Sequence, residues 1–229
     1  MGSSKEDIEY AQSLCPNCDF SIEQPQHSIF LDQFQIGKYE ITNRQYAQCV
    51  KVGRCRGVPD PGVEKEMHPV VKVSWNDAKE FCEWVGGRLP TEAEWEKAAS
   101  WDDGAKTKHT YPWGGTSDCT YANYAGKEGG NDTCVGDTMP VGSYESVKSP
   151  YGLYDMAGNA SEWVSSLRMP YPYDADDGRE EMSMSSTDVR VLRGGSWGLS
   201  VNFVRSVSRS GSYPTLNFDA VGFRCSRSP

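Results

Sequence analysis

The chain of 229 residues is 37% hydrophobic and 24% charged, which is the balance of a globular protein and excludes wholesale disorder. Its 32 acidic residues outnumber its 23 lysines and arginines, so its net charge of −9 repels phosphate backbones and anionic lipid surfaces. We therefore expect no nucleic-acid partner. No stretch approaches the roughly 20 apolar residues of a membrane span, so we expect no membrane insertion by the chain as given.

Residues 1–27 are expected to form an N-terminal extension outside the main domain, which then spans residues 28–229. Residues 1–4 (MGSS) are typical of a leader left by a cloning vector, and Cys15 and Cys18 follow in a single CxxC motif. One such motif supplies only half of a four-cysteine zinc site, and the intervening Pro-Asn favours a turn over a redox-active helix start. A local or interchain disulfide is our interpretation, with zinc or redox chemistry as the alternatives.

Regular secondary structure is expected mainly in the first half of the main domain. Residues 28–41 alternate apolar and polar side chains, which predicts strands with a turn at Gly37. Three helices are predicted by capping boxes, in which Ser or Thr is followed three residues later by an acid or amide. These boxes are Thr42 with Gln45, Ser74 with Asp77, and Thr91 with Glu94.

The second predicted helix has an apolar face, on which Ala78, Phe81, Cys82 and Val85 recur at helical spacing. After residue 100 the helical periodicity stops, and glycine, proline, tyrosine and asparagine dominate. Short apolar pieces at 139–144, 189–193 and 221–225 predict brief strands between loops. We therefore predict one α+β domain with few helices, short strands and many loops.

The cysteines favour disulfides over a metal site, because eight of them accompany only three histidines. Cys49 and Cys55 bracket a short glycine-containing loop that a disulfide could close, and Cys119 and Cys134 enclose a loop rich in glycine and asparagine. Disulfides persist in oxidising compartments, so we expect a protein of a cell surface or virion, or a secreted one. A cytoplasmic location is not excluded.

Three ordered motifs carry a family resemblance. They are GRLPTEAEWE at 87–96, GLYDMAGNASEWV at 152–164, and RGGSW at 193–197 with GFRC at 222–225. Over roughly residues 30–226 the chain resembles the formylglycine-generating-enzyme-like, or sulfatase-modifying-factor, domain. The resemblance implies a C-type lectin-like fold of the formylglycine-generating-enzyme branch.

The catalytic cysteines of that family have no counterpart here. Formylglycine-generating enzymes use two cysteines, five residues apart, shortly after the Gly-Gly-Ser-aromatic motif, to bind copper and activate oxygen. The matching positions are Leu199 and Val204, and no cysteine lies between residues 135 and 224. We therefore predict no catalytic residue and no copper, with an oxidative enzyme of this type as the alternative.

The segment that replaces the catalytic one, residues 198–220, has an unusual composition. It contains no Lys, Glu, Gln, Met or Trp, although these types occur 48 times in the chain. About five would be expected in a segment of this length from composition alone. These five amino acids are the ones that replacement of adenines in AAY codons cannot reach. The chain thus resembles the retroelement-diversified variable proteins, and an ordinary inert family member with a strand-rich C-terminus is the alternative.

The resemblance implies that segment 198–220 displays a ligand-binding surface on a constant framework. Arg205 and Arg209 are expected to be framework residues that tie loops by forked hydrogen bonds, and Pro214 to fix a turn. The ligand, whose identity the sequence does not give, is expected to be a protein or a cell-surface molecule. The candidate contact residues are Leu199, Ser200, Val201, Phe203, Ser208, Ser210, Ser212, Tyr213, Thr215, Leu216, Phe218 and Asp219. For Val201 and Leu216, core packing is the equally weighted alternative.

A structural calcium ion is implied at a family site. The matching positions are Asp155, the backbone of Gly158 and Ala160, and Glu162, which together supply the hard oxygen ligands that calcium prefers. The alternative is that Glu162 caps the turn or pairs with an arginine. A second family site near Asn123, with an acidic partner such as Asp132, stays open.

One long-range disulfide is also predicted, between Cys82 and Cys225. Cys82 lies on the inward face of the second predicted helix, and the lectin-like fold places the last apolar strand, which ends at Cys225, beside the N-terminal part of the domain. The alternatives are two reduced, buried thiols, or a bond from Cys82 to Cys15 or Cys18.

Overall fold

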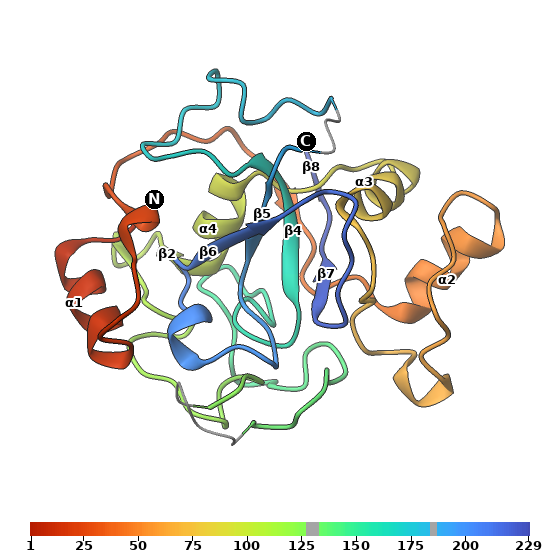
Figure 1. Cartoon of the computed structure of the whole chain (residues 1–229), viewed down its shortest axis with the longest axis horizontal. Helices are drawn as coiled ribbons and strands as arrows, with labels where there is room; N and C mark the ends of the chain where they lie inside the picture. The colour runs from red at the N-terminus through yellow and green to blue at the C-terminus, as the bar shows by residue number, and fades with distance from the viewer. Residues whose placement is uncertain (127–132, 184–186) are drawn as a thin grey trace.

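The computed structural model describes residues 1–126, 133–183 and 187–229 (Figure 1). The predicted helices are present as α2 (Asn43–Lys51), α3 (Trp75–Trp84) and α4 (Glu92–Ser100), and in each the capping box is formed. Val85, expected on the buried face of α3, is 51% exposed, because the helix ends at Trp84 and Val85 follows as its C-terminal cap. That expectation was wrong for Val85 alone, since Ala78, Phe81 and Cys82 are buried.

A further helix, α1 (Lys5–Leu14), lies in the segment expected to be an extension. The Ser4 side chain accepts from the Asp7 backbone N–H, and the Asp7 carboxylate accepts from that of Ser4. This fourth capping box was the sequence signal for the helix. Residues 1–4 are packed into the structure, since the Gly2 N–H donates to Glu96 Oε1 at 2.8 Å. The proposed boundary at residue 28 stays a prediction.

The central sheet has four strands in the order β6-β5-β4-β7. They are β4 (Ser161–Leu167), β5 (Arg190–Arg193), β6 (Arg209–Ser212) and β7 (Val221–Phe223), with β4 and β7 parallel and the other pairs antiparallel. The strands predicted at 189–193 and 221–225 are therefore confirmed in their main parts. The strand predicted at 139–144 is wrong, because that stretch forms a turn in which the Ser143 N–H donates to the Pro140 carbonyl.

Two small ribbons complete the strands of the described chain. β1 (Gln35–Ile36) pairs with β8 (Ser226–Arg227), and β2 (Trp101–Asp102) pairs with β3 (Thr107–Lys108). Within 28–41, where longer strands were expected, β1 is the only strand. Three short 3₁₀ turns are η1 (Ser21–Glu23), η2 (Val63–Lys65) and η3 (Val201–Phe203).

The main core lies between the sheet and the helices α3 and α4, which both contact β4. Trp75 and Trp163 are fully buried there, and each satisfies its indole N–H by donating to a backbone carbonyl, of Val164 and Val73 respectively. Figure 1 shows α1 and α2 on opposite sides of this core. Segment 198–220 is part of this arrangement, because it supplies β6 at the edge of the sheet.

All eight cysteines are in four disulfides. The predicted bonds Cys49–Cys55 and Cys119–Cys134 are present, and so is the local Cys15–Cys18 bond. Cys82 and Cys225 are bonded, with 5.5 Å between their Cα atoms, which connects α3 to the end of the chain. The pairing predicted from the resemblance is thus confirmed, and four such bonds indicate an oxidising environment. Among the described helices, none has the length and hydropathy needed to cross a bilayer.

Candidate functional site

Segment 198–220 begins five residues after the end of β5 and ends immediately before β7. It forms η3, passes through β6, and continues in a loop toward β7 (Figure 1). η3 contacts α1, whereas the Phe218 carbonyl in the later loop accepts from the Lys72 N–H at 2.8 Å. These are two of the places at which the segment meets the N-terminal half of the chain.

Arg205 and Arg209 fix this segment from inside the molecule. The Arg205 guanidinium donates to both carboxylate oxygens of Glu23, at 3.0 and 2.7 Å, and Arg209 donates to both oxygens of Glu92, at 2.7 Å each. All four side chains are at most 3% exposed. The framework role predicted for the two arginines is confirmed, because buried forked ion pairs hold both the distance and the orientation of the loops they join.

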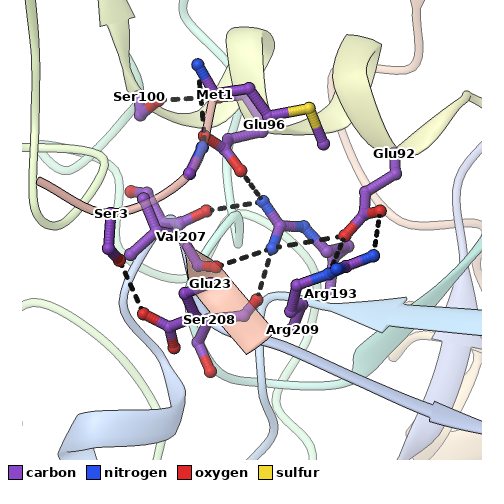
Figure 2. A network of polar contacts seen from close by, with 12 residues as sticks. Met1, Ser3, Glu23, Glu92, Glu96, Ser100, Arg193, Val207, Ser208 and Arg209 are labelled. Carbon is purple, nitrogen blue, oxygen red and sulfur yellow. Dashed lines mark hydrogen bonds and ion pairs between the residues drawn. The ribbon is translucent and has the colours of Figure 1, made fainter. Parts of the chain in front are cut away.

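Arg193, at the end of β5, is the centre of the same network (Figure 2). Its guanidinium donates to Glu96 Oε2 at 2.5 Å, lies 3.8 Å from Glu92 Oε1, and donates to the Val207 and Ser208 carbonyls at 2.8 and 2.7 Å. The backbone just before β6 is thus held by a side chain on the neighbouring strand. These hydrogen bonds join the first half of the segment to the sheet.

Four large apolar side chains of the segment are exposed despite this anchoring. Phe203 is 37% exposed, Tyr213 48%, Leu216 45% and Phe218 42%, so each presents more than a third of its surface. Pro214 is buried in the turn in which the Leu216 N–H donates to the Tyr213 carbonyl, as expected. For Leu216 the structure decides against the core alternative.

The remaining contact candidates divide by exposure. Ser210, Thr215 and Asp219 are exposed, and Leu199, Ser200 and Ser212 are half-buried. Val201 and Ser208 are 6% and 7% exposed, so Val201 follows its core-packing alternative and the prediction of Ser208 as a contact residue was wrong. Val201 turns inward from η3 into an apolar cluster, and Ser208 lies where the backbone is bonded to Arg193.

The positions that match the catalytic cysteines hold no metal-binding group. Val204 is fully buried in the apolar cluster that contains Tyr111 and Tyr124. A Cβ on Gly195, whose φ is +67°, would lie 2.6 Å from the Phe203 carbonyl oxygen, so the glycine lets these backbones approach closely. Every cysteine is in a disulfide, so no thiolate is available to a cuprous ion, and the residues present do not fit copper.

The predicted calcium site contains a buried ion pair. Glu162 is fully buried and accepts from Arg224 with both oxygens, at 2.7 and 2.6 Å, and from the Trp95 indole N–H at 2.7 Å. The alternative left open for Glu162, pairing with an arginine, is therefore present. As a calcium ligand, Glu162 would have to share its oxygens with these donors.

Two other carboxylates interact electrostatically with Arg224 of this pair: Glu40, and Asp155, which is itself a predicted ligand. Glu40, 1% exposed, accepts from Asn159 Nδ2 and from the Ala160 N–H. Burial and the neighbouring negative charges raise its pKa well above the usual range, and burial raises the pKa of Asp155 to about 6. Three carboxylates thus act electrostatically on the single guanidinium of Arg224, and a divalent ion beside them would favour the ionised forms of Glu40 and Asp155. No set of three metal-binding side chains converges within the described residues, so calcium stays a prediction.

Near the second family site, Asn123 is buried and its Oδ1 has no donor within the described part of the chain. Its Nδ2 donates to the Asp137 carbonyl at 2.7 Å. Gly158, with φ +79°, packs directly against the Asn123 backbone, which joins the two predicted sites. Asp132 lies outside the described residues, so the acidic partner is not placed.

The sequence did not indicate which glutamates belong to this framework. Glu23, Glu92 and Glu96 lie 97 to 182 residues before the arginines with which they pair. Glu92 and Glu96 are buried on α4, at a spacing that also suits solvent-facing charges. The one available signal was their position in the GRLPTEAEWE motif.

Comparison with known proteins gives the family context. The model of the sulfatase-modifying factor enzyme 1-like domain matches residues 2–229, a range that includes the N-terminal segment. The serine/threonine-protein kinase pkn1 of Chlamydia caviae is 35% identical over 232 residues, which cover 90% of this chain and 34% of the kinase.

Two further relatives bear on catalysis. The inactive C-alpha-formylglycine-generating enzyme 2 of Bos taurus is 37% identical over 177 residues, covering 73% of this chain and 53% of that protein. The hercynine oxygenase of Mycobacterium tuberculosis is 29% identical over 232 residues, covering 86% of this chain and 53% of the oxygenase. The chain thus spans about a third to a half of the length of these relatives.

Solved structures confirm the fold. PvdO from Pseudomonas aeruginosa superposes with a TM-score of 0.73 at 26% identity, covering 100% of this chain and 90% of that one. Variable protein 1 of Treponema denticola superposes with a TM-score of 0.69 at 26% identity, covering 92% and 90%. The predicted C-type lectin-like fold of the formylglycine-generating-enzyme branch is therefore correct.

Proposed function

Because the chain belongs to the sulfatase-modifying factor enzyme 1-like family, we propose that it is a non-catalytic member whose segment 198–220 forms a diversified ligand-binding surface. One observation carries the proposal: the segment exposes four large apolar or aromatic side chains, while its two arginines, Arg205 and Arg209, are held in buried ion pairs. A surface built in this way can change its contacts without changing its fold.

The side chains at the family's catalytic positions do not support catalysis. Leu199 and Val204 stand where the family's cysteine pair would be, and Val204 is sealed in an apolar cluster. The similarity to a relative named as an inactive formylglycine-generating enzyme agrees with this interpretation.

Binding is supported by the composition of the exposed part. Tyr213, Phe203 and Phe218 offer large contact areas at low conformational cost, while the interspersed serines and glycines adapt to a partner. The missing Lys, Glu, Gln, Met and Trp are the residues that adenine replacement in AAY codons cannot produce. Similarity to a solved structure that is named a variable protein also supports a diversified binding surface.

We propose a protein or a cell-surface molecule as the ligand, and a cell surface, a virion or the exterior as the location. The four disulfides fit an oxidising environment. We further propose that calcium binds beside Asp155, with the Gly158 and Ala160 carbonyls and Glu162 as ligands. The excess of buried carboxylates there supports a cation.

A combinatorial library tests the binding surface. Randomising Phe203, Tyr213, Leu216 and Phe218 should leave most variants folded, with melting temperatures within a few degrees of the parent, and selection on a chosen protein should yield binders. A control library at the buried positions Val201 and Val204 should give mostly unfolded chains. If most variants of the exposed library unfold, or none binds after selection, the proposal fails.

The gene offers an independent test of diversification. A near-identical template repeat that differs only at adenines, with a reverse transcriptase gene nearby, is expected close to the coding sequence. A locus that has neither would refute diversification, while leaving the non-catalytic proposal in place.

The second candidate is an oxidative enzyme, which the similarity to hercynine oxygenase favours. Incubation of the purified chain with copper or ferrous iron, oxygen and either a sulfatase-type cysteine peptide or hercynine should give no oxidised product by mass spectrometry. Metal-dependent turnover of either substrate would overturn the non-catalytic proposal.

A further inference from the structure

A cavity of about 310 Å³ lies between segment 198–220 and the constant part of the domain. Trp197 and Asp219 line it from the C-terminal side, and Asp60 and Lys72 line it from loops of the N-terminal half. The Lys72 N–H donates to the Phe218 carbonyl at 2.8 Å, so the cavity lies where the segment meets the constant framework. A ligand held by the exposed side chains of this segment can therefore reach into it.

Negative charge exceeds positive charge around this cavity. Asp60, Asp137 and Asp219 line it against Lys65 and Lys72. The Lys65 ammonium forms an ion pair with Asp137 at 2.6 Å, so these two charges compensate each other. Within the described chain, Asp60 and Asp219 have no ion pair, and Asp60 accepts one hydrogen bond from a backbone N–H two residues on. Two carboxylates are thus free to meet a cation, with only the Lys72 ammonium to compete.

The cavity also has an aromatic wall. Trp197 is partly buried, and its indole N–H has no acceptor within the described residues. The negative face of an indole ring attracts cations, and the attraction grows when the cation is partly removed from water. Carboxylates beside an aromatic ring therefore offer an ammonium or guanidinium group both an ion pair and a cation–π contact.

We propose that this cavity receives an arginine side chain of the ligand, whose guanidinium pairs with Asp60 and Asp219 and lies against Trp197. The inference rests on the proposed function, because Asp219 belongs to the diversified segment, and it adds a protein that presents arginine as the partner. Arginine fits better than lysine, since a planar guanidinium both forks onto carboxylates and stacks on aromatic rings. An anionic group would meet three carboxylates with a single unpaired lysine, and the net charge of −9 would repel it.

Two matched peptides test the proposal. The probes are acetyl-Gly-Arg-Gly-amide and its citrulline analogue, which keeps the shape but has no charge. Binding is followed by NMR of the Trp197 indole N–H, a signal assigned by its loss in Trp197→Phe. We expect the arginine peptide to bind at least tenfold more tightly than the citrulline peptide, with a difference that shrinks as salt is added.

Variants locate the site. Asp60→Asn with Asp219→Asn should remove the tenfold preference, while Asp32→Asn, an exposed aspartate without ion pairs elsewhere on the described surface, should leave it unchanged. Equal affinity for the two peptides, tighter binding of acetyl-Gly-Glu-Gly-amide, or an unchanged preference in the double variant would each overturn the proposal. The combinatorial library described above separates the cavity proposal from the proposed function. Folded binders without an arginine preference would refute only the arginine-binding cavity. An arginine preference in a chain whose library yields no binders would refute only the diversified surface.

Discussion

Removing the carboxylate of Glu92 tests whether the buried arginines hold segment 198–220 in place. In Glu92→Gln the side chain keeps its size but loses its charge, so Arg209 loses its carboxylate partner and keeps at most one of the two oxygen acceptors, and Arg193 loses a negative charge 3.8 Å away. These three side chains are at most 1% exposed, and water cannot replace the lost partner. The variant therefore leaves buried positive charge without compensation.

The size of the effect follows from that burial. Breaking a buried ion pair by removing one partner costs about 3–5 kcal/mol. At about 2–4 °C per kcal/mol for a chain of this length, the melting temperature should fall by about 6–20 °C. Replacing Glu92 and Arg209 together by methionine should restore part of the loss, because no unpaired charge remains at that position.

Thermal and urea unfolding, followed by circular dichroism, measure both variants against the parent chain. Tyr213→Ala serves as the matched control, since its side chain is 48% exposed, and it should change the free energy of unfolding by no more than about 0.5 kcal/mol. A free energy of unfolding for Glu92→Gln within about 1 kcal/mol of the parent would show that the arginines do not depend on this carboxylate. The framework argument would then be wrong.

Three further predictions address the other parts of the structure. Millimolar calcium should raise the melting temperature relative to chelator, through preferential binding to the folded chain beside Asp155, and equal melting temperatures would count against the site. Val201→Ala should cost about 2 kcal/mol, because a buried side chain leaves a cavity, and a change as small as that of Tyr213→Ala would place Val201 on the surface after all. Peptide mapping without reductant should recover Cys82 joined to Cys225, and free thiols at both positions would refute the bond. Its loss in a double alanine variant should cost on the order of 4 kcal/mol, because the bond closes a loop of 143 residues in the unfolded chain.

Local sequence was sufficient for the helices and for the family. A capping box involves two residues that lie three positions apart in the sequence. The starts of α2, α3 and α4 could therefore be predicted without knowing which elements pack against these helices. The box of Ser4 and Asp7 follows the same rule and marks the start of α1, although residues 1–4 also resemble a vector leader. The loss of the cysteine pair at Leu199 and Val204 was likewise visible in the sequence.

Tertiary structure alone decided which parts of the C-terminal segment face outward and what holds the rest. In a helix or strand a fixed period assigns each side chain to a face, but segment 198–220 is mostly irregular, so Val201 and Phe203 could not be distinguished from their spacing. The partners of Arg205 and Arg209 lie 182 and 117 residues away, and no local pattern records a contact over such a separation. Burying an unpaired guanidinium costs free energy, so the fold is stable only when it places a carboxylate beside each of these arginines.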